Sequence, residues 1–302
     1  MPISSTPRPL GVTSLRVFPI AYGCWRFAGT EVRQARQKIE AAVEIGINLF
    51  DHADIYGGDG AAEALFGRAL SEMPHLRNTI LIATKCGIVP GVPYNSSAAH
   101  IVRACEGSLR RLQIEVIDLY QIHRPDWLGH PQEIAAALTE LRHAGKIREV
   151  GVSNYTATQL TALQRYLPFP IATQQPALSA WCLDPLRDGV LDQCLSERLT
   201  PLAWSPLAGG RLGLSVEAAR AQPDGDRLAA VITYLDQLAK RDGIPRSAVA
   251  LAFLLTHPAG VVPIIGSQQP ERIRESAAAF AARLTRADWY GIVMASQGAA
   301  LP

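Results

Sequence analysis

The chain lacks any apolar run near the ~18 residues that a membrane span needs, and it has no stretch of like charges. Its formal net charge is only +2, which argues against nucleic-acid binding. Residues 1–11 are polar and proline-rich, without the apolar core of a signal peptide. We therefore expect a cytoplasmic protein with neither a membrane nor a nucleic-acid partner.

Cysteine and lysine are both scarce. The five cysteines are odd in number and widely spaced, without a C-x-x-C pair, which favours a reducing compartment over a disulfide framework or a zinc site. The lysines are Lys38, Lys85, Lys146 and Lys240, so a lysine that ends an apolar segment is informative. Of the 302 residues, 48 % are hydrophobic and 19 % are charged, the balance of a folded globular chain.

Short apolar segments alternate with helical periodicity along the whole chain. We predict strands at 17–22, 47–50, 79–84, 116–122, 149–152, 171–175, 201–204 and 260–265. Helices are predicted at 32–45, 61–70, 98–112, 131–143, 156–166, 228–241, 247–255, 270–282 and 286–295, with a long loop at 207–227. No G-x-G-x-x-G follows the first strand, so an α/β fold with a single closed (β/α)8 TIM barrel, one domain over residues 1–302, fits better than an open doubly wound sheet.

In such a barrel the active site lies at the carboxyl ends of the strands. Four side chains near these ends fit together chemically: Asp51, Tyr56, Lys85 and His123. A tyrosine hydroxyl has a pKa near ~10, and a nearby ammonium lowers that pKa. A carboxylate would keep the lysine charged, and a histidine can donate a hydrogen bond to a carbonyl oxygen. The set predicts a proton donor for a carbonyl that receives a hydride. The set contains no strong nucleophile beside a base, so the sequence gives no indication of acyl transfer.

Five segments in order resemble the motifs of the aldo-keto reductases. Residues 51–57 (DHADIYG) look like the family's D-x-A-x-x-Y-G motif, and 119–125 (LYQIHRP) look like its fourth-strand histidine segment. Residues 151–155 (GVSNY), 204–207 (WSPL) and 264–276 (IIGSQQPERIRES) resemble three further motifs. Each motif alone is weak evidence, but five motifs in the family's order and with its spacings make a strong resemblance. The resemblance implies an NADPH-dependent carbonyl reductase.

The resemblance implies roles residue by residue. Tyr56 would be the general acid, Lys85 would lower its pKa, Asp51 would pair with Lys85, and His123 would orient the substrate carbonyl. Ser153, Asn154 and Gln174 would hold the nicotinamide carboxamide, and Trp204 would stack on the ring. The other expected NADPH contacts are Gly23, Trp25, Asp51, Ser205, Pro206, Leu207, Gly209, Arg211, Gly266, Ser267, Arg272, Glu275 and Ser276. Trp25 and Trp127 would line the substrate site with Tyr56 and His123.

Three departures from the family pattern bear on the cofactor. Gly266 stands where many members have a lysine, Ser276 stands where asparagine is common, and the segment after the sixth strand reads Gln-Gln-Pro-Ala at 174–177. The expected NADPH preference therefore rests mainly on Arg272 as the partner of the 2′-phosphate.

Two other functions fit parts of the sequence. One is an NADPH-binding regulatory protein of the same fold with little turnover. The other is a barrel lyase or hydrolase that uses Asp51, Lys85 and His123 with a metal or a Schiff base, but it leaves the GVSN and WSPL segments without a role. We expect no metal at His52, because neighbouring residues of a strand face opposite sides. The expected partner is a small-molecule carbonyl substrate, and the expected state is a monomer or a weak homo-oligomer.

Overall fold

The computed structural model describes residues 3–301 and confirms the predicted (β/α)8 barrel. Residues 1, 2 and 302 of the predicted domain lie outside this description. All neighbouring strands of the barrel are parallel, and β10 pairs with β3 to close the ring. The strands are β3 (Ala21–Gly23), β4 (Leu49–Asp51), β5 (Leu81–Cys86), β6 (Ile117–Ile122), β7 (Ile147–Ser153), β8 (Thr173–Gln175), β9 (Thr200–Ala203) and β10 (Val262–Ile265).

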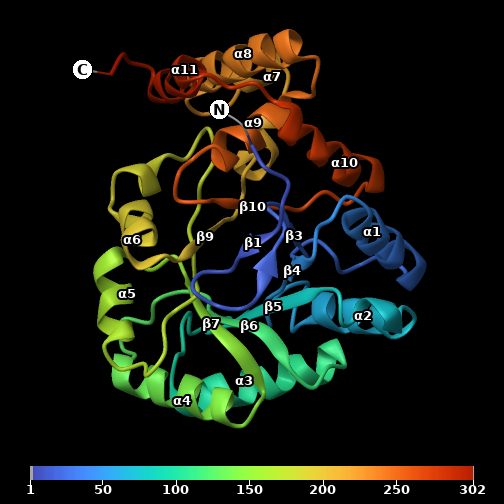
Figure 1. The fold of residues 1–302 in the computed structure, drawn as a ribbon, viewed down its shortest axis with the longest axis vertical. Helices are drawn as coiled ribbons and strands as arrows, with labels where there is room; N and C mark the ends of the chain where they lie inside the picture. Colours follow the sequence, from blue (N-terminus) through green and yellow to red (C-terminus); the bar gives the residue numbers. More distant parts are fainter. Residues whose placement is uncertain (1–2, 302) are drawn as a thin grey trace.

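Helices surround the barrel, and α7, α8 and α11 gather beyond α9 on one side of the ring (Figure 1). The helices are α1 (Val32–Glu44), α2 (Ala61–Ser71), α3 (Ala98–Leu112), α4 (Pro131–His143), α5 (Ala157–Gln164), α6 (Val190–Glu197), α7 (Val216–Arg220), α8 (Gly225–Asp242), α9 (Arg246–Leu255), α10 (Pro270–Glu275) and α11 (Arg286–Gln297). Short 3₁₀ turns occur at η1 (Pro74–Leu76), η2 (Asp184–Leu186), η3 (Ala208–Gly213) and η4 (Ser276–Ala281).

A two-stranded hairpin plugs the amino-terminal end of the barrel. Strands β1 (Arg8–Pro9) and β2 (Arg16–Val17) pair in antiparallel fashion near the centre of the ring of helices (Figure 1). Leu10 and Leu15 of the hairpin are buried against barrel-lining side chains of β4 to β6, β9 and β10. Gly11, with φ of +59°, approaches the carbonyl of Ala172 so closely that a Cβ would lie 2.5 Å from its oxygen. The end that stays open for chemistry is the carboxyl end.

Three predictions about the elements are wrong, and one helix was not predicted. The strand expected at 17–22 is divided between β2 and β3, because Pro19 has no N–H and restricts the residue before it. The loop expected at 207–227 contains η3 and α7, whose first turn is capped by the Ser215 hydroxyl accepting from the Ala218 N–H at 3.1 Å. The helix expected at 270–282 ends as α10 and continues as η4, and α6 was not expected.

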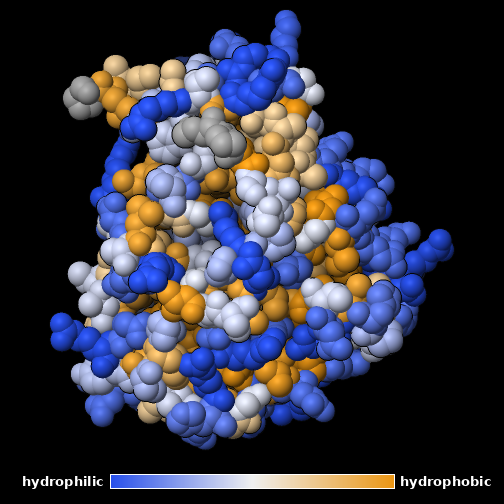
Figure 2. Space-filling view, in the orientation of Figure 1, coloured by the Kyte–Doolittle hydropathy of each residue, from blue (hydrophilic) through white to orange (hydrophobic). Residues whose placement is uncertain are grey.

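The outer face shown in the space-filling view mixes hydrophilic and hydrophobic side chains (Figure 2). Hydrophobic residues on that face are dispersed among charged ones rather than gathered in one large area. No helix within residues 3–301 combines the length and the apolar character that crossing a membrane requires.

Candidate active site

A buried ion pair links the ends of β4 and β5. The Lys85 ammonium donates to Asp51 Oδ2 at 2.7 Å and to the backbone carbonyl of His52 at 2.7 Å. Lys85 is 0 % exposed and Asp51 is 3 % exposed. Burial alone would lower the pKa of Lys85, but Asp51 and Tyr56 outweigh it, so this pKa stands above its ordinary value. Lys85 is therefore a permanently charged donor inside the barrel.

The second oxygen of Asp51 is held by two amides that the sequence analysis did not assign to the site. Gln175 Nε2 donates to Asp51 Oδ1 at 2.9 Å, and Gln121 Nε2 donates to it at 3.4 Å. Gln121 in turn accepts from the Thr173 hydroxyl at 3.1 Å. The signal was present in the alternation of strands, because Gln121 shares a face with His123 and Gln175 shares one with Thr173.

Tyr56 lies on the loop between β4 and α2, against the ion pair. Lys85 Nζ lies 5.0 Å from the centroid of its ring, and its ring meets that of His123 edge to face with centroids 5.8 Å apart. Burial raises the pKa of Tyr56 above its ordinary value, although Lys85 acts to lower it. The ammonium has the predicted sign, and it offsets part of the effect of burial.

His123 completes the group as a neutral imidazole. It is 8 % exposed, and its Nδ1 is buried without a hydrogen-bond partner. Burial first, and then the charges of Lys85 and Arg124, lower the pKa of His123 to about 2. A neutral ring keeps one N–H for an acceptor in the site. The structure thus brings together the four side chains Asp51, Tyr56, Lys85 and His123.

A second polar group follows β7 and β9. Trp204 Nε1 donates to Asn154 Oδ1 at 2.9 Å, and Asn154 Nδ2 donates to Ser153 Oγ at 2.7 Å and to the His123 carbonyl at 3.2 Å. Asn154 has a φ of +58°, which turns the chain sharply at the end of β7. Gln174 donates to a backbone carbonyl at 2.7 Å, while its Oε1 is buried without a partner. Ser153, Asn154 and Trp204 therefore lie together beside His123, whereas Gln174, which pairs with Val152, faces the opposite side of β8 from Gln175 and the Asp51 carboxylate.

The segment after β9 bends through several left-handed residues. Ser205, Ala208 and Gly209 have φ values of +51°, +52° and +67°. Pro206 is buried, while Leu207 is half-buried and belongs to the edge of a core cluster. The Arg211 guanidinium is engaged away from this bend, 4.6 Å from the centroid of the Trp181 ring and 2.8 Å from the carbonyl of Pro223.

The segment from β10 into α10 carries the last predicted contacts. Gly266 and Ser267 are half-buried at the end of β10. Arg272 and Glu275 are exposed on α10, and neither takes part in an ion pair within residues 3–301. Ser276 is buried, and its hydroxyl donates to the Ile273 carbonyl at 2.6 Å. Arg272 is therefore the free cation of this segment among the described residues.

The predicted wall residues differ in their surroundings. Trp25 is 56 % exposed and lies beside Gly266, where a Cβ would be 3.8 Å from its ring. Gly23, the residue that ends β3, is buried against Ile264. Trp127 is 86 % exposed and projects from the loop after β6. Trp25 thus lies near the predicted cofactor segment, whereas Trp127 is almost fully exposed to solvent.

His52 points away from the barrel interior, as strand alternation predicts. Its ring packs edge to face on Phe66 of α2, with centroids 4.5 Å apart, and neither ring nitrogen has a partner. Burial, followed by the charge of Lys85, lowers the pKa of His52 to about 3. It therefore lies on the opposite face of β4 from the Asp51 carboxylate.

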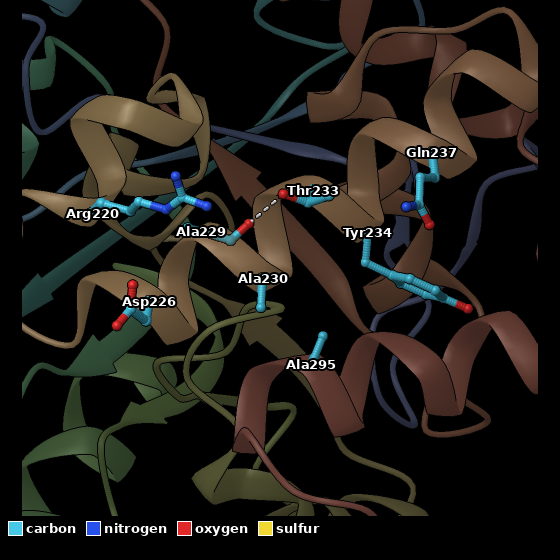
Figure 3. Close-up of a pocket in the computed structure, with 8 residues that line it drawn as sticks. All are labelled: Arg220, Asp226, Ala229, Ala230, Thr233, Tyr234, Gln237 and Ala295. Atoms are coloured by element: carbon cyan, nitrogen blue, oxygen red, sulfur yellow. Dashed lines mark hydrogen bonds between the residues drawn. The ribbon is translucent and has the colours of Figure 1, made fainter.

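Two cavities lie away from this site. One of about 870 Å³ is lined by residues at the start of β5 and β6, including Asp118. Another of about 480 Å³ lies among α7, α8 and α11, between Arg220, Asp226, Tyr234 and Ala295 (Figure 3). The hydrogen bond drawn there runs within α8, from Thr233 to the Ala229 carbonyl. None of the four grouped side chains lines either cavity.

The sequence profile of the Aldo/keto reductase family matches residues 19–295. The chain therefore belongs to the aldo/keto reductase family, a class of (β/α)8-barrel oxidoreductases. It is 45 % identical over 309 residues to a 6-dehydroglucose reductase of Novosphingobium aromaticivorans, an alignment that covers 100 % of this chain and 99 % of that protein. A second protein of that name, from Agrobacterium fabrum, is 38 % identical over 91 % of this chain and 93 % of its own length.

Solved structures show the same relationship. The glycerol dehydrogenase of Gluconobacter oxydans matches with a TM-score of 0.84 at 28 % identity, covering 97 % of this chain and 95 % of that one. A thermostable aldo-keto reductase solved with the inhibitor epalrestat matches with a TM-score of 0.81 at 26 % identity, covering 97 % of this chain and 99 % of that one. The family and the fold expected from the sequence are thus confirmed.

Proposed function

We propose that this protein is an NADPH-dependent reductase that converts an aldehyde or ketone to the alcohol, with Tyr56 as the proton donor. The observation that carries the proposal is the contact of Tyr56 with both the buried Lys85–Asp51 pair and the neutral His123. Around one point, the neutral imidazole can donate a hydrogen bond to a carbonyl oxygen, and the phenol can donate a second hydrogen bond and then its proton. The ammonium stabilises the phenolate that results.

The order of proton movement follows from the charges. His123 donates an N–H to the substrate oxygen and fixes its position, since its low pKa keeps the ring neutral. Tyr56 transfers its hydroxyl proton to that oxygen as negative charge develops there. Lys85, held by Asp51, stabilises the phenolate that remains on Tyr56. Bulk solvent then returns the proton to Tyr56 after the alcohol leaves.

The residues around the site fit a dinucleotide. When bound, NADPH supplies the hydride to the carbonyl carbon. Ser153 and Asn154, which are bonded to each other, fit the polar atoms of a carboxamide, and the half-buried Trp204 bonded to Asn154 offers an aromatic ring beside them. Arg272, free and exposed on α10, fits the 2′-phosphate.

The substrate we propose is a sugar-derived aldehyde such as 6-dehydroglucose. The two relatives of that name support it, one of them along its whole length. Arg124 supports it as well, because its half-buried guanidinium lies 5.7 Å from the centroid of Trp204 and makes no ion pair with any described residue. Its free N–H groups are suited to the hydroxyls or ring oxygen of a sugar.

The test is NADPH oxidation with 6-dehydroglucose beside a panel of simple aldehydes and ketones. The Tyr56→Phe variant should bind NADPH with the parent's affinity and lose turnover by about 10²- to 10⁴-fold, the usual contribution of a general acid. Tyr290→Phe, which changes an exposed tyrosine of α11, should keep the parent rate. Parent-like turnover in Tyr56→Phe contradicts the assigned acid. NADPH binding without turnover of any carbonyl would favour a regulatory protein instead.

A further inference from the structure

Lys38, on the face of α1 that packs toward the barrel, is a buried cation without a counter-anion. It is 3 % exposed. Its ammonium donates to the Thr30 hydroxyl at 3.2 Å and to Gln268 Oε1 at 2.8 Å, and it lies 5.1 Å from the centroid of the Phe27 ring. All three groups are neutral. Within residues 3–301, no carboxylate lies close enough to Lys38 to form an ion pair.

The contrast with Lys85 makes this arrangement informative. Lys85 is completely buried and has Asp51 at 2.7 Å, whereas the ammonium of Lys38 lies in a partly buried environment and, within residues 3–301, has no carboxylate partner. The titratable neighbour of Lys38 is the thiol of Cys24, which burial keeps protonated by raising its pKa well above the ordinary value. A buried charge without a partner is strongly unfavourable. An ammonium whose partners are all neutral is suited to an anion that comes from outside the fold.

A continuous set of hydrogen bonds connects Lys38 to the segment after β10. Gln268, which accepts from Lys38, donates through Nε2 to the Gly266 carbonyl at 3.2 Å and to the Tyr22 hydroxyl at 3.4 Å. The Tyr22 hydroxyl donates to the Ser267 carbonyl at 2.9 Å. The carbonyls of Gly266 and Ser267 thus accept hydrogen bonds from the side chains of Gln268 and Tyr22, and Gln268 is itself bound to the Lys38 ammonium.

We infer that Lys38 is a positioning residue for the 2′-phosphate of the cofactor, holding residues 266–268 through Gln268 and supplying the positive charge that favours a phosphate over a hydroxyl. The inference rests on the proposed use of NADPH. It also accounts for Gly266, the place where the family resemblance led us to expect a lysine. The charge is supplied from α1 beneath the segment, instead of from the segment itself.

The space around Gly266 allows a test of whether a lysine at 266 can replace the charge of Lys38. A Cβ built there would meet its nearest neighbours at 3.8 Å, which is ordinary contact, and the residue has no left-handed φ. A Cβ is therefore tolerated at 266 without a shift of its neighbours. If the two positions provide the same charge, Gly266→Lys should compensate for the loss of Lys38.

The experiment is a set of fluorescence and calorimetric titrations with NADPH and with NADH. Lys38→Met should weaken NADPH binding about 5- to 20-fold, as expected for the loss of one partly screened charge, and change NADH binding less than about twofold. Lys38→Arg should retain most of the affinity, and adding Gly266→Lys to Lys38→Met should restore it. Lys240→Met, which removes an exposed lysine from α8, is the control for net charge.

The outcomes separate this inference from the proposed function. Equal losses for NADPH and NADH, or no loss, in a folded Lys38→Met protein would overturn the role of Lys38 while leaving the reductase proposal in place. Parent protein that binds both cofactors equally would overturn the NADPH assignment and the inference together. Should Lys38→Met not fold, Lys38→Gln keeps a polar group without the charge and must show the same NADPH-specific loss.

Discussion

The buried pair of Asp51 and Lys85 allows a quantitative test of the site's electrostatics. Asp51→Asn removes the carboxylate and leaves the fully buried ammonium with neutral oxygen acceptors, among them the His52 carbonyl, and no counter-charge. Breaking a buried pair in this way costs about 3–5 kcal/mol of unfolding free energy, because the remaining charge is uncompensated. Lys85→Met should cost less, since the Asp51 carboxylate keeps Gln175 and Gln121 as donors.

The double variant, Asp51→Asn with Lys85→Met, removes both charges at once. Its destabilisation should fall at least about 2 kcal/mol short of the sum of the two single losses, because neither partner is left buried alone. Guanidinium denaturation followed by tryptophan fluorescence and circular dichroism measures all four corners of the cycle. The readout is stability alone, so the result does not depend on the cofactor or the substrate.

A surface pair provides the matched control for this cycle. Arg36 and Glu72 lie 2.9 Å apart with side chains 39 % and 51 % exposed. Solvent screens such a pair, and its coupling energy should stay below about 1 kcal/mol. If the coupling of Asp51 with Lys85 is no larger than that of Arg36 with Glu72, burial does not strengthen the Asp51–Lys85 pair, and the argument for a permanently charged Lys85 is refuted.

Two further predictions concern stability. Burial, and then the charge of Glu63, raises the pKa of Asp54 from 3.8 to about 7. Between these two pH values the native state holds a proton that the unfolded chain has lost. The free energy of unfolding therefore falls as the pH rises from about 4 to about 7. Asp54→Asn should reduce this fall by on the order of 2–4 kcal/mol, which denaturation at pH 5 and pH 8 checks; an unchanged slope would show that Asp54 ionises normally. Gly11→Ala should destabilise by about 1–3 kcal/mol, as measured by thermal unfolding, because its Cβ would meet the Ala172 carbonyl. Gly29→Ala, which also has positive φ but meets nothing within 4 Å, should cost less, and equal losses would mean that the contact with Ala172 is unimportant.

Long periodic segments of the sequence were sufficient to predict their elements. The bounds expected at 98–112 and 131–143 coincide with α3 and α4, whose apolar residues repeat with helical spacing over several turns. The short helix α6 was missed because it begins after Gly189 without a side-chain cap, whereas the equally short α5 has the Thr156 cap. The break at Pro19 was missed because the apolar run 17–22 outweighed the single proline in the interpretation.

The site was predictable as a set of residue types, but not in its supporting contacts. The chemistry of phenol, ammonium, carboxylate and imidazole pointed to the grouped side chains before any geometry was known. Gln175 lies 124 residues from Asp51 in sequence, and only closure of the barrel brings them together. The sequence showed the charge that lowers the pKa of Tyr56, but not how deeply the phenol is buried, which raises that pKa. The partner of Lys38 on a distant segment was likewise invisible.

The hairpin at the base of the barrel constrains the order of events during synthesis. Arg8 donates to the carbonyl of Val261 at 2.6 Å, across 253 residues of sequence. At ribosomal speeds of ~5–20 residues per second, that separation corresponds to a wait on the order of 10–50 s. Until β10 emerges, the growing chain carries two unpaired strand edges and a hairpin with no complete barrel to seal. This interval is when the nascent protein is most open to edge-to-edge aggregation.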